Sequence, residues 1–157
     1  MISVEILNPF ILAAVEVLCN MVSADVSRGK LSLEHSTDTL QEITVSLSLV
    51  GQVQGTVLYS LSEATAIAFV GQMMGSPIDQ LDALATSGIA ELGNVITGRT
   101  TTKLAAIGCE STISTPSVIL GRNVRIKTLV VPRIVVPLQT QYGVLEIHLA
   151  VTNGTSS

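Results

Sequence analysis

The spacing of apolar residues changes along this chain, and this change limits the fold more than any other feature. From residue 111 onward apolar residues tend to recur at every second position, as they do in half-buried strands. Residues 43–50 alternate in the same way, and the turn at Gly51-Gln52 predicts a hairpin with residues 53–61. Gly55 in that second strand predicts a bulge or a close approach of another backbone. The further predicted strands are 31–33, 112–120, 124–131, 134–138 and 144–151.

Three other segments carry the 3.6-residue period of helices. Asn8 and Pro9 suit the N-cap and the first position of one helix, and Ser62 suits the N-cap of another. The predicted helices are 9–25, 63–74 and 79–106. Together these elements predict an α+β fold, with a mostly antiparallel sheet and long helices packed on one face.

The composition supports one domain. The chain has 157 residues, of which 47% are hydrophobic, and this is enough for one substantial core. We therefore expect a single domain over residues 1–157, with 1–7 as a short leading segment and 152–157 as a loose polar tail.

The charge of the chain excludes two classes of partner. Its net charge is −4, and its 8 Lys and Arg residues are scattered rather than clustered. This provides no basic surface for nucleic acid or for an anionic membrane. The N-terminus lacks the basic region of a signal peptide, and no apolar run approaches the roughly 18 residues of a membrane span. We expect a cytoplasmic protein that binds neither nucleic acid nor membrane.

Residues that commonly bind metals or act as nucleophiles are isolated in this sequence. Cys19 and Cys109 form no Cys-x-x-Cys pair, and His35 and His148 have no companions at ligand spacing. The sequence also lacks glycine-rich phosphate loops and a Gly-x-Ser-x-Gly motif. We expect no metal site and no bound cofactor. Cys19 lies in an apolar helical pattern and is expected to be a buried free thiol.

The predicted helix 79–106 has one polar face that weakens the helix. Four residues share this face within about 60° of a helical projection, nearly opposite the apolar residues: Ser87, Glu91, Asn94 and Gly98. Gly93, Gly98 and Asn94 together lower helix stability by about 2.5 kcal/mol relative to alanine. Such a departure from local preference is typical of a functional site. A solvated face, with glycines that let another element pack closely, has the same pattern.

An ordered set of motifs across the chain indicates a family. The motifs are Asn8-Pro9-Phe10-Ile11, Gly51-x-x-x-Gly55-Thr-Val, Ser62-Glu63-x-Thr65-Ala66, Ser87-x-x-x-Glu91-x-x-Asn94 with Gly98, and Pro116-Ser-Val-Ile-x-Gly121. With these motifs the chain resembles the CheX phosphatases of the CheC/CheX/FliY group over nearly its whole length. CheC-type members carry two Glu-x-x-Asn motifs in an internal repeat, whereas this chain carries one, which is the CheX pattern.

The resemblance implies that the chain accelerates hydrolysis of the aspartyl phosphate on a phosphorylated CheY-type response regulator, with Glu91 and Asn94 as the catalytic residues. The carboxamide of Asn94 can orient the attacking water without adding negative charge beside the phosphate. Glu91 would pair with the active-site lysine of the regulator. A rival assignment makes Glu91 the general base, although an exposed carboxylate is a weak base. A divalent metal ion is expected in the regulator, and no cofactor in this chain.

Three further residues are candidates for supporting roles at this site. Ser87 either adds a polar contact to the partner or is an ordinary exposed helix serine. Gly98 is expected to permit close approach, either by the regulator or by the sheet of this protein. Pro116 is expected to shape the sheet edge near the helix rather than to touch the substrate.

The resemblance also implies a homodimer formed by joining sheets edge to edge. The predicted strands 134–138 and 144–151 carry little charge and would make an aggregation-prone edge on a monomer. A two-fold dimer that pairs the sheets is therefore expected.

Two other functions remain open from the sequence. One is a non-catalytic module that binds a response regulator, like the flagellar-switch relatives that share the fold but lack the Glu-x-x-Asn face. The presence of both Glu91 and Asn94 argues against that module. The other is a dimeric scaffold that binds a regulator and slows its turnover, and the sequence does not separate it from a phosphatase.

Overall fold

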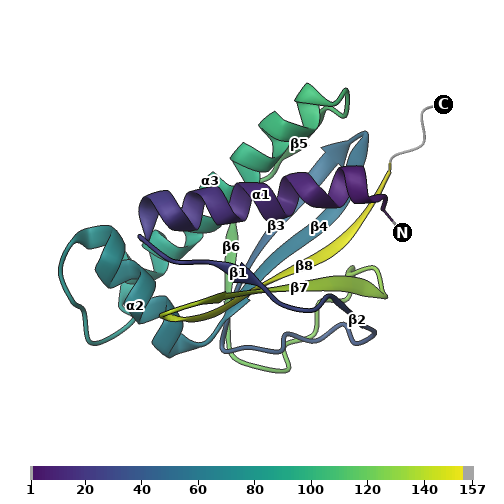
Figure 1. Cartoon of the computed structure of the whole chain (residues 1–157). Helices are drawn as coiled ribbons and strands as arrows, with labels where there is room; N and C mark the ends of the chain where they lie inside the picture. The colour runs from purple at the N-terminus through teal and green to yellow at the C-terminus, as the bar shows by residue number, and fades with distance from the viewer. Residues whose placement is uncertain (1, 154–157) are drawn as a thin grey trace.

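The computed structural model describes residues 2–153 of the chain, and within them an eight-stranded antiparallel sheet is packed against three helices (Figure 1). The helices are α1 (Val4–Met21), α2 (Glu63–Met74) and α3 (Ala83–Ala106). The strands are β1 (Ser27–Arg28), β2 (Ser32–Glu34), β3 (Ile43–Gly51), β4 (Val53–Leu61), β5 (Ser111–Ile113), β6 (Ser117–Leu120), β7 (Arg133–Thr140) and β8 (Gly143–Asn153). The predicted α+β fold is confirmed. In the predicted tail 152–157, residues 152 and 153 belong to β8, and 154–157 lie outside the described residues.

The long strands form the centre of the sheet and the short strands form its edges. The order is β1-β7-β8-β4-β3-β5, with β2 also paired to β7 and β6 also paired to β3. The β3–β4 hairpin was predicted, and its register pairs Ile43 with Leu61 and Leu49 with Gly55. Gly55 has φ +136°, and a Cβ on it would meet the carbonyl oxygen of Ala150, so the predicted close backbone approach is confirmed.

The predicted strands 134–138 and 144–151 were expected to form an exposed edge of the monomer's sheet, and the strand order shows that this expectation is wrong. The second of them, β8, lies between β4 and β7, and the outer side of β7 is paired with β1 and β2. The outer edges are formed by short strands instead, β1 and β2 on one side and β5 and β6 on the other.

The main core lies between the helices and one face of the sheet. Figure 1 shows α1 crossing the sheet with α3 beside it and α2 at one end. Strand residues on this face include Val45, Tyr59 and Ile147, each at most 2% exposed, and α1 and α3 contribute Phe10 and Ile89, each 1% exposed. The helices therefore pack on one face, as predicted.

Part of the opposite face is covered by two irregular segments, residues 35–42 and 121–132. Leu129 and Ile126 pack on Leu58 and Ala150 of the sheet. The predicted strand 124–131 is wrong, because these residues form an irregular segment whose Ile126 and Leu129 pack on the sheet from outside. Backbone bonds join the two segments to each other, from Thr39 N to Val124 O and from Ile126 N to Thr37 O.

A buried arginine fastens one of these segments to the sheet. Arg133 is fully buried, and its guanidinium donates to the carbonyl oxygens of Ser36 and Asp38. Its Nε also donates to Nδ1 of His148 at 2.9 Å, and Nε2 of His148 lies 3.2 Å from a carboxylate oxygen of Glu146. Desolvation lowers the pKa of Arg133, and the neighbouring carboxylates of Glu34, Glu146 and Asp38 oppose that shift.

Other boundaries differ from the prediction at prolines. The predicted strand 112–120 is divided into β5 and β6 by a break that contains Pro116, which has no N–H to donate to a ladder.

Helix α1 begins at Val4 after a Ser3 N-cap, so Pro9 lies inside it and residues 1–7 are not a separate leading segment. Ile2 and Ile6 extend the buried stripe of Phe10 at a spacing of four residues, and their burial explains the earlier start. The helix ends at Met21 rather than near Asp25.

Helix α1 is long and apolar enough to cross a membrane by length and composition, with a mean hydropathy of 1.6 over Val4–Met21. The expectation that no apolar run approaches this length is therefore wrong. The packing of α1 in the core also explains why its residues are apolar, because Phe10, Val17 and Leu18 are at most 1% exposed. Such a buried stripe is the property of a core helix in a globular domain.

Helix α3 lies unusually close to the sheet at one glycine. A Cβ on Gly93 would lie 2.8 Å from Cγ1 of Val45 and 3.3 Å from Cδ2 of Tyr59. One turn later Thr97 is fully buried, and its hydroxyl lies 2.8 Å from the hydroxyl of Tyr59. The glycine and this hydrogen bond fix the rotation of α3 on the sheet.

We predict that Gly93→Ala and Gly98→Ala have opposite effects on stability. Both changes gain about 1 kcal/mol of helix propensity. Only Gly93→Ala creates a clash, which costs about 1–3 kcal/mol, because a Cβ on Gly98 meets nothing within 4 Å. The free energies of unfolding from urea titration should therefore differ by about 1–3 kcal/mol. Equal stabilisation by the two changes would contradict the close packing at Gly93.

Candidate functional site

The outer face of α3 carries the residues that the sequence analysis selected. Ser87 and Glu91 are exposed, and Asn94 and Gly98 are partly exposed. On the opposite side Ile89, Leu92 and Ile96 are at most 2% exposed. The predicted division of the helix into a core face and a polar face is confirmed. Asn94 follows Glu91 by three residues, so the carboxylate and the carboxamide are neighbours on the helix surface.

The helix that presents these residues is capped at its N-terminus by a local signal. Asp82 caps the N-terminus, where its carboxylate accepts a hydrogen bond from the backbone N–H of Ala85 at 2.8 Å. The helix therefore begins at Ala83 rather than near Asp79, and it ends at Ala106 as predicted. A helix capped in this way and buried along its core face gives the exposed side chains a rigid base.

The two glycines of the motif region have different surroundings. Gly93 faces the sheet, whereas Gly98 faces outward with open space around its Cα. The expectation that Gly98 permits close approach by the protein's own sheet is therefore wrong, and approach by a partner stays a prediction. Pro116 lies in the break between β5 and β6, two edge strands that contact α3, and this agrees with its predicted place at the sheet edge.

An ion cluster between α1 and α3 lies beside this face and was not predicted. Glu16 of α1 accepts hydrogen bonds from Nζ of Lys103 at 2.8 Å and from a guanidinium nitrogen of Arg99 at 3.3 Å. The hydrogen bond from Lys103 is the largest cause that lowers the pKa of Glu16. Sequence reasoning missed the cluster because its members are 83 and 87 positions apart, and no local pattern joins them.

The isolated cysteine and histidine residues take structural or surface positions. Cys19 is exposed, so the prediction of a buried thiol is wrong; it follows the buried Leu18 by one residue and points about 100° away from it. His148 is buried in the Arg133 network, and His35 is exposed. Among residues 2–153, His, Cys, Asp and Glu side chains form no group of three or more that could hold a metal ion.

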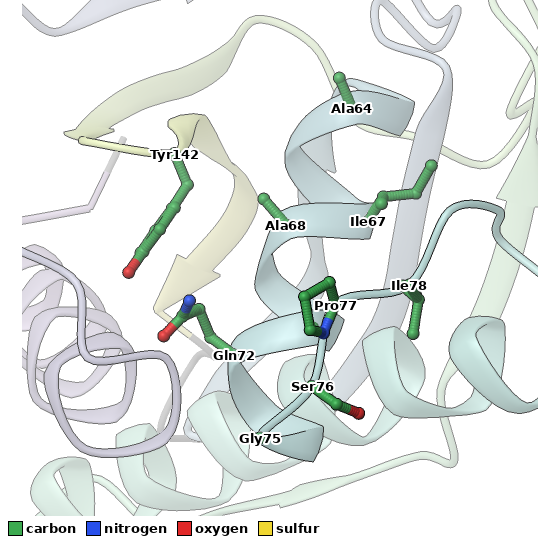
Figure 2. Close-up of a pocket in the computed structure, with 10 residues that line it drawn as sticks. Ala64, Ile67, Ala68, Gln72, Gly75, Ser76, Pro77, Ile78 and Tyr142 are labelled. Carbon is green, nitrogen blue, oxygen red and sulfur yellow. The ribbon is translucent and has the colours of Figure 1, made fainter.

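A hollow of about 360 Å³ lies on the outer surface of α2 and not at the Glu91 and Asn94 pair (Figure 2). Ala64, Ala68 and Gln72 of α2 line it together with Tyr142 from the β7–β8 turn. The residues around it have no carboxylate, imidazole or thiol group. Its chemistry is therefore that of an apolar surface depression.

The chemistry of the α3 face suits a large partner. An exposed carboxylate can pair with a cation, and a carboxamide can both accept and donate hydrogen bonds. These groups stand on the outside of a helix, so they can enter the recessed site of another macromolecule. Small substrates are usually bound in concave, largely apolar pockets instead.

Comparison with known proteins places the chain in a family. A family model described as "Chemotaxis phosphatase CheX" matches residues 43–139. The CheY-P phosphatase CheX of Thermotoga maritima is 30% identical over 152 residues, which cover 96% of this chain and 97% of that protein.

Solved structures agree in fold. A CheC-like superfamily protein from Shewanella sp. PV-4 has a TM-score of 0.83 at 26% identity, covering 94% of this chain and 97% of that one. The CheX–CheY–BeF3–Mg complex from Borrelia burgdorferi contains a chain with a TM-score of 0.79 at 25% identity, covering 95% of this chain and 99% of that one. The extent of these matches, with the Glu-x-x-Asn face on α3, shows that the chain belongs to the CheX family of chemotaxis phosphatases.

Proposed function

We propose that this protein is a phosphatase that accelerates hydrolysis of the aspartyl phosphate on a CheY-type response regulator. The observation that carries the proposal is the pairing of an exposed Glu91 with Asn94 on the outer face of α3. The family adds support, since the Thermotoga maritima relative is a CheY-P phosphatase and the Borrelia burgdorferi relative is in a complex with CheY.

Asn94 is the residue that positions the attacking water. Phosphoryl transfer depends mainly on in-line placement of the nucleophile and on charge stabilisation. The amide oxygen of Asn94 accepts a hydrogen bond from the water, so that a lone pair of the water points at phosphorus. A neutral carboxamide does this without repelling the phosphoryl oxygens.

Glu91 docks the regulator through a cation, and the lysine of the regulator's active site is the expected partner. Its carboxylate is exposed, so the ion pair forms at a partly solvated surface and depends on ionic strength. The alternative role of Glu91 as general base predicts a loss of turnover without a loss of affinity.

The protein supplies no metal ion or cofactor in this proposal. The divalent ion that neutralises the phosphoryl oxygens belongs to the regulator, and Ser87, Gly98 and Pro116 support the contact. The regulator is a cytoplasmic type of protein, so we propose a cytoplasmic location for this chain as well.

We also propose a two-fold homodimer that pairs sheets through an outer edge. The uncharged strand β6 is the candidate, because Leu120 at its end is 59% exposed and its sequence lacks the charges that normally protect an edge.

Replacing Asn94 with alanine should remove most of the rate acceleration and leave binding intact. We expect a loss of about 100-fold in single-turnover dephosphorylation, or about 2.7 kcal/mol at the barrier. Affinity for the phosphorylated regulator should change by no more than a few-fold, and helix propensity should rise by roughly 0.5 kcal/mol. Asn94→Asp, which keeps the size but adds charge, should be impaired as well. Full activity in Asn94→Ala would reject the water-positioning role.

Replacing Glu91 with alanine should weaken regulator binding as well as turnover. The lost affinity should shrink as salt rises, because the ion pair is partly exposed. Binding is measured by titration at low and high salt, with Glu110→Ala, an exposed carboxylate beyond the end of α3, as the matched control. Unchanged affinity with reduced turnover would instead favour Glu91 as general base.

Light scattering at micromolar concentration should give the mass of a dimer. Leu120→Lys places a charge on the β6 edge and should shift the protein towards monomer without changing its fold, which circular dichroism would check. A monomer mass for the unaltered protein would contradict the dimer.

A further inference from the structure

The most exposed large apolar side chain of α3 lies on the same face as the Glu91 and Asn94 pair. Leu84, the second residue of the helix, is 67% exposed. It precedes Glu91 by seven residues, which is two helical turns, and a projection places the two side chains within about 20° of each other. The polar face of α3 therefore begins with a large apolar residue.

Along this face the chemistry changes in a fixed order. Leu84 is followed by the hydroxyl of Ser87, the carboxylate of Glu91 and the carboxamide of Asn94, over about 15 Å of helix. Beyond Asn94 the cations of the helix, Arg99 and Lys103, are paired with Glu16. The end that carries Leu84 thus offers an apolar group beside an acidic one.

The size of an interface shows that contacts must extend beyond Glu91 and Asn94. A specific protein interface buries about 800 Å² on each partner. A stripe of about 15 Å by 10 Å on one helix provides roughly 150 Å². A partner that reaches Asn94 must therefore cover neighbouring surface, and Leu84 is an apolar side chain within reach along the same face.

We infer that Leu84 is an apolar anchor for the receiver domain of the regulator, and this inference rests on the proposed phosphatase function. The partner surface must present an apolar side chain about 10 Å from the cation that pairs with Glu91, which is the axial distance from Leu84 to Glu91. Leu84 lies away from the phosphoryl group, so it sets affinity and the choice of receiver domain rather than the chemical step.

The test compares two truncations of equally exposed apolar side chains, each in the first turn of its helix. Leu84→Ala is set against Val4→Ala, because Val4 is also 67% exposed and also lies in the first turn of its helix, on α1. The probe is a CheY-type receiver domain from the same organism. It is loaded with beryllofluoride and Mg²⁺ for affinity and phosphorylated with acetyl phosphate for single-turnover rates.

We expect Leu84→Ala to weaken binding about tenfold at both low and high salt. With the receiver domain saturated by the variant, its single-turnover rate should equal that of the unaltered protein. The reason is that the contact of Leu84 with the receiver domain is the same in the ground state and in the transition state of hydrolysis. Val4→Ala should bind and turn over normally. Both variants should melt at the temperature of the unaltered protein, since both side chains are exposed.

Three results would overturn the inference. If Leu84→Ala binds within twofold of the unaltered protein while Glu91→Ala is weakened, Leu84 is not an anchor and the phosphatase proposal stands. If Leu84→Ala changes a dimer into a monomer, the residue is a contact between copies instead. If the unaltered protein neither binds nor dephosphorylates the receiver domain, the proposed function fails, and the inference fails with it.

Discussion

The close contact of α3 with the sheet at Gly93 is the constraint on which the rest of the structure depends. With Val45 and Tyr59 directly beneath its backbone, the helix can take only one rotation on the sheet. The hydrogen bond between Thr97 and Tyr59 fixes the same rotation one turn later. If α3 were rotated about its axis by one residue position, about 100°, the carboxamide of Asn94 would face the core and apolar side chains would be exposed. The placement of the candidate site is thus a result of core packing.

Features that depend on short stretches of sequence were predicted well. Helix α2 has the bounds expected from its Ser62 N-cap and its Gly75 end, and the turn at Gly51 gave the β3–β4 hairpin. The polar face of α3 was also predicted, because the period of a helix alone determines which side chains lie together. For these elements local preference and final packing agree.

Features that depend on contacts between distant parts were not predicted. Residues 124–131 alternate like a strand, and only the position of Leu129 over the opposite face of the sheet shows otherwise. The ion cluster of Glu16 joins helices that are separated by much of the chain. Strands 134–138 and 144–151 do not form a free edge either, because β8 lies between β4 and β7, and β7 is paired with β1 and β2 on its outer side. Each of these features is set by tertiary structure, which a periodic pattern does not contain.

The segment fastened by Arg133 has a consequence for how the domain can assemble. Helices cover one face of the sheet, and residues 35–42 and 121–132 cover the other face around Leu58 and Ala150, so a second sheet cannot stack on that part. In the homodimer proposed above, the copies would instead extend the sheet sideways, strand against strand. In such a pair the helices of each copy would lie on a face of the joined sheet rather than between the joined strands, so the Glu91 and Asn94 face of α3 would stay open to solvent in both copies.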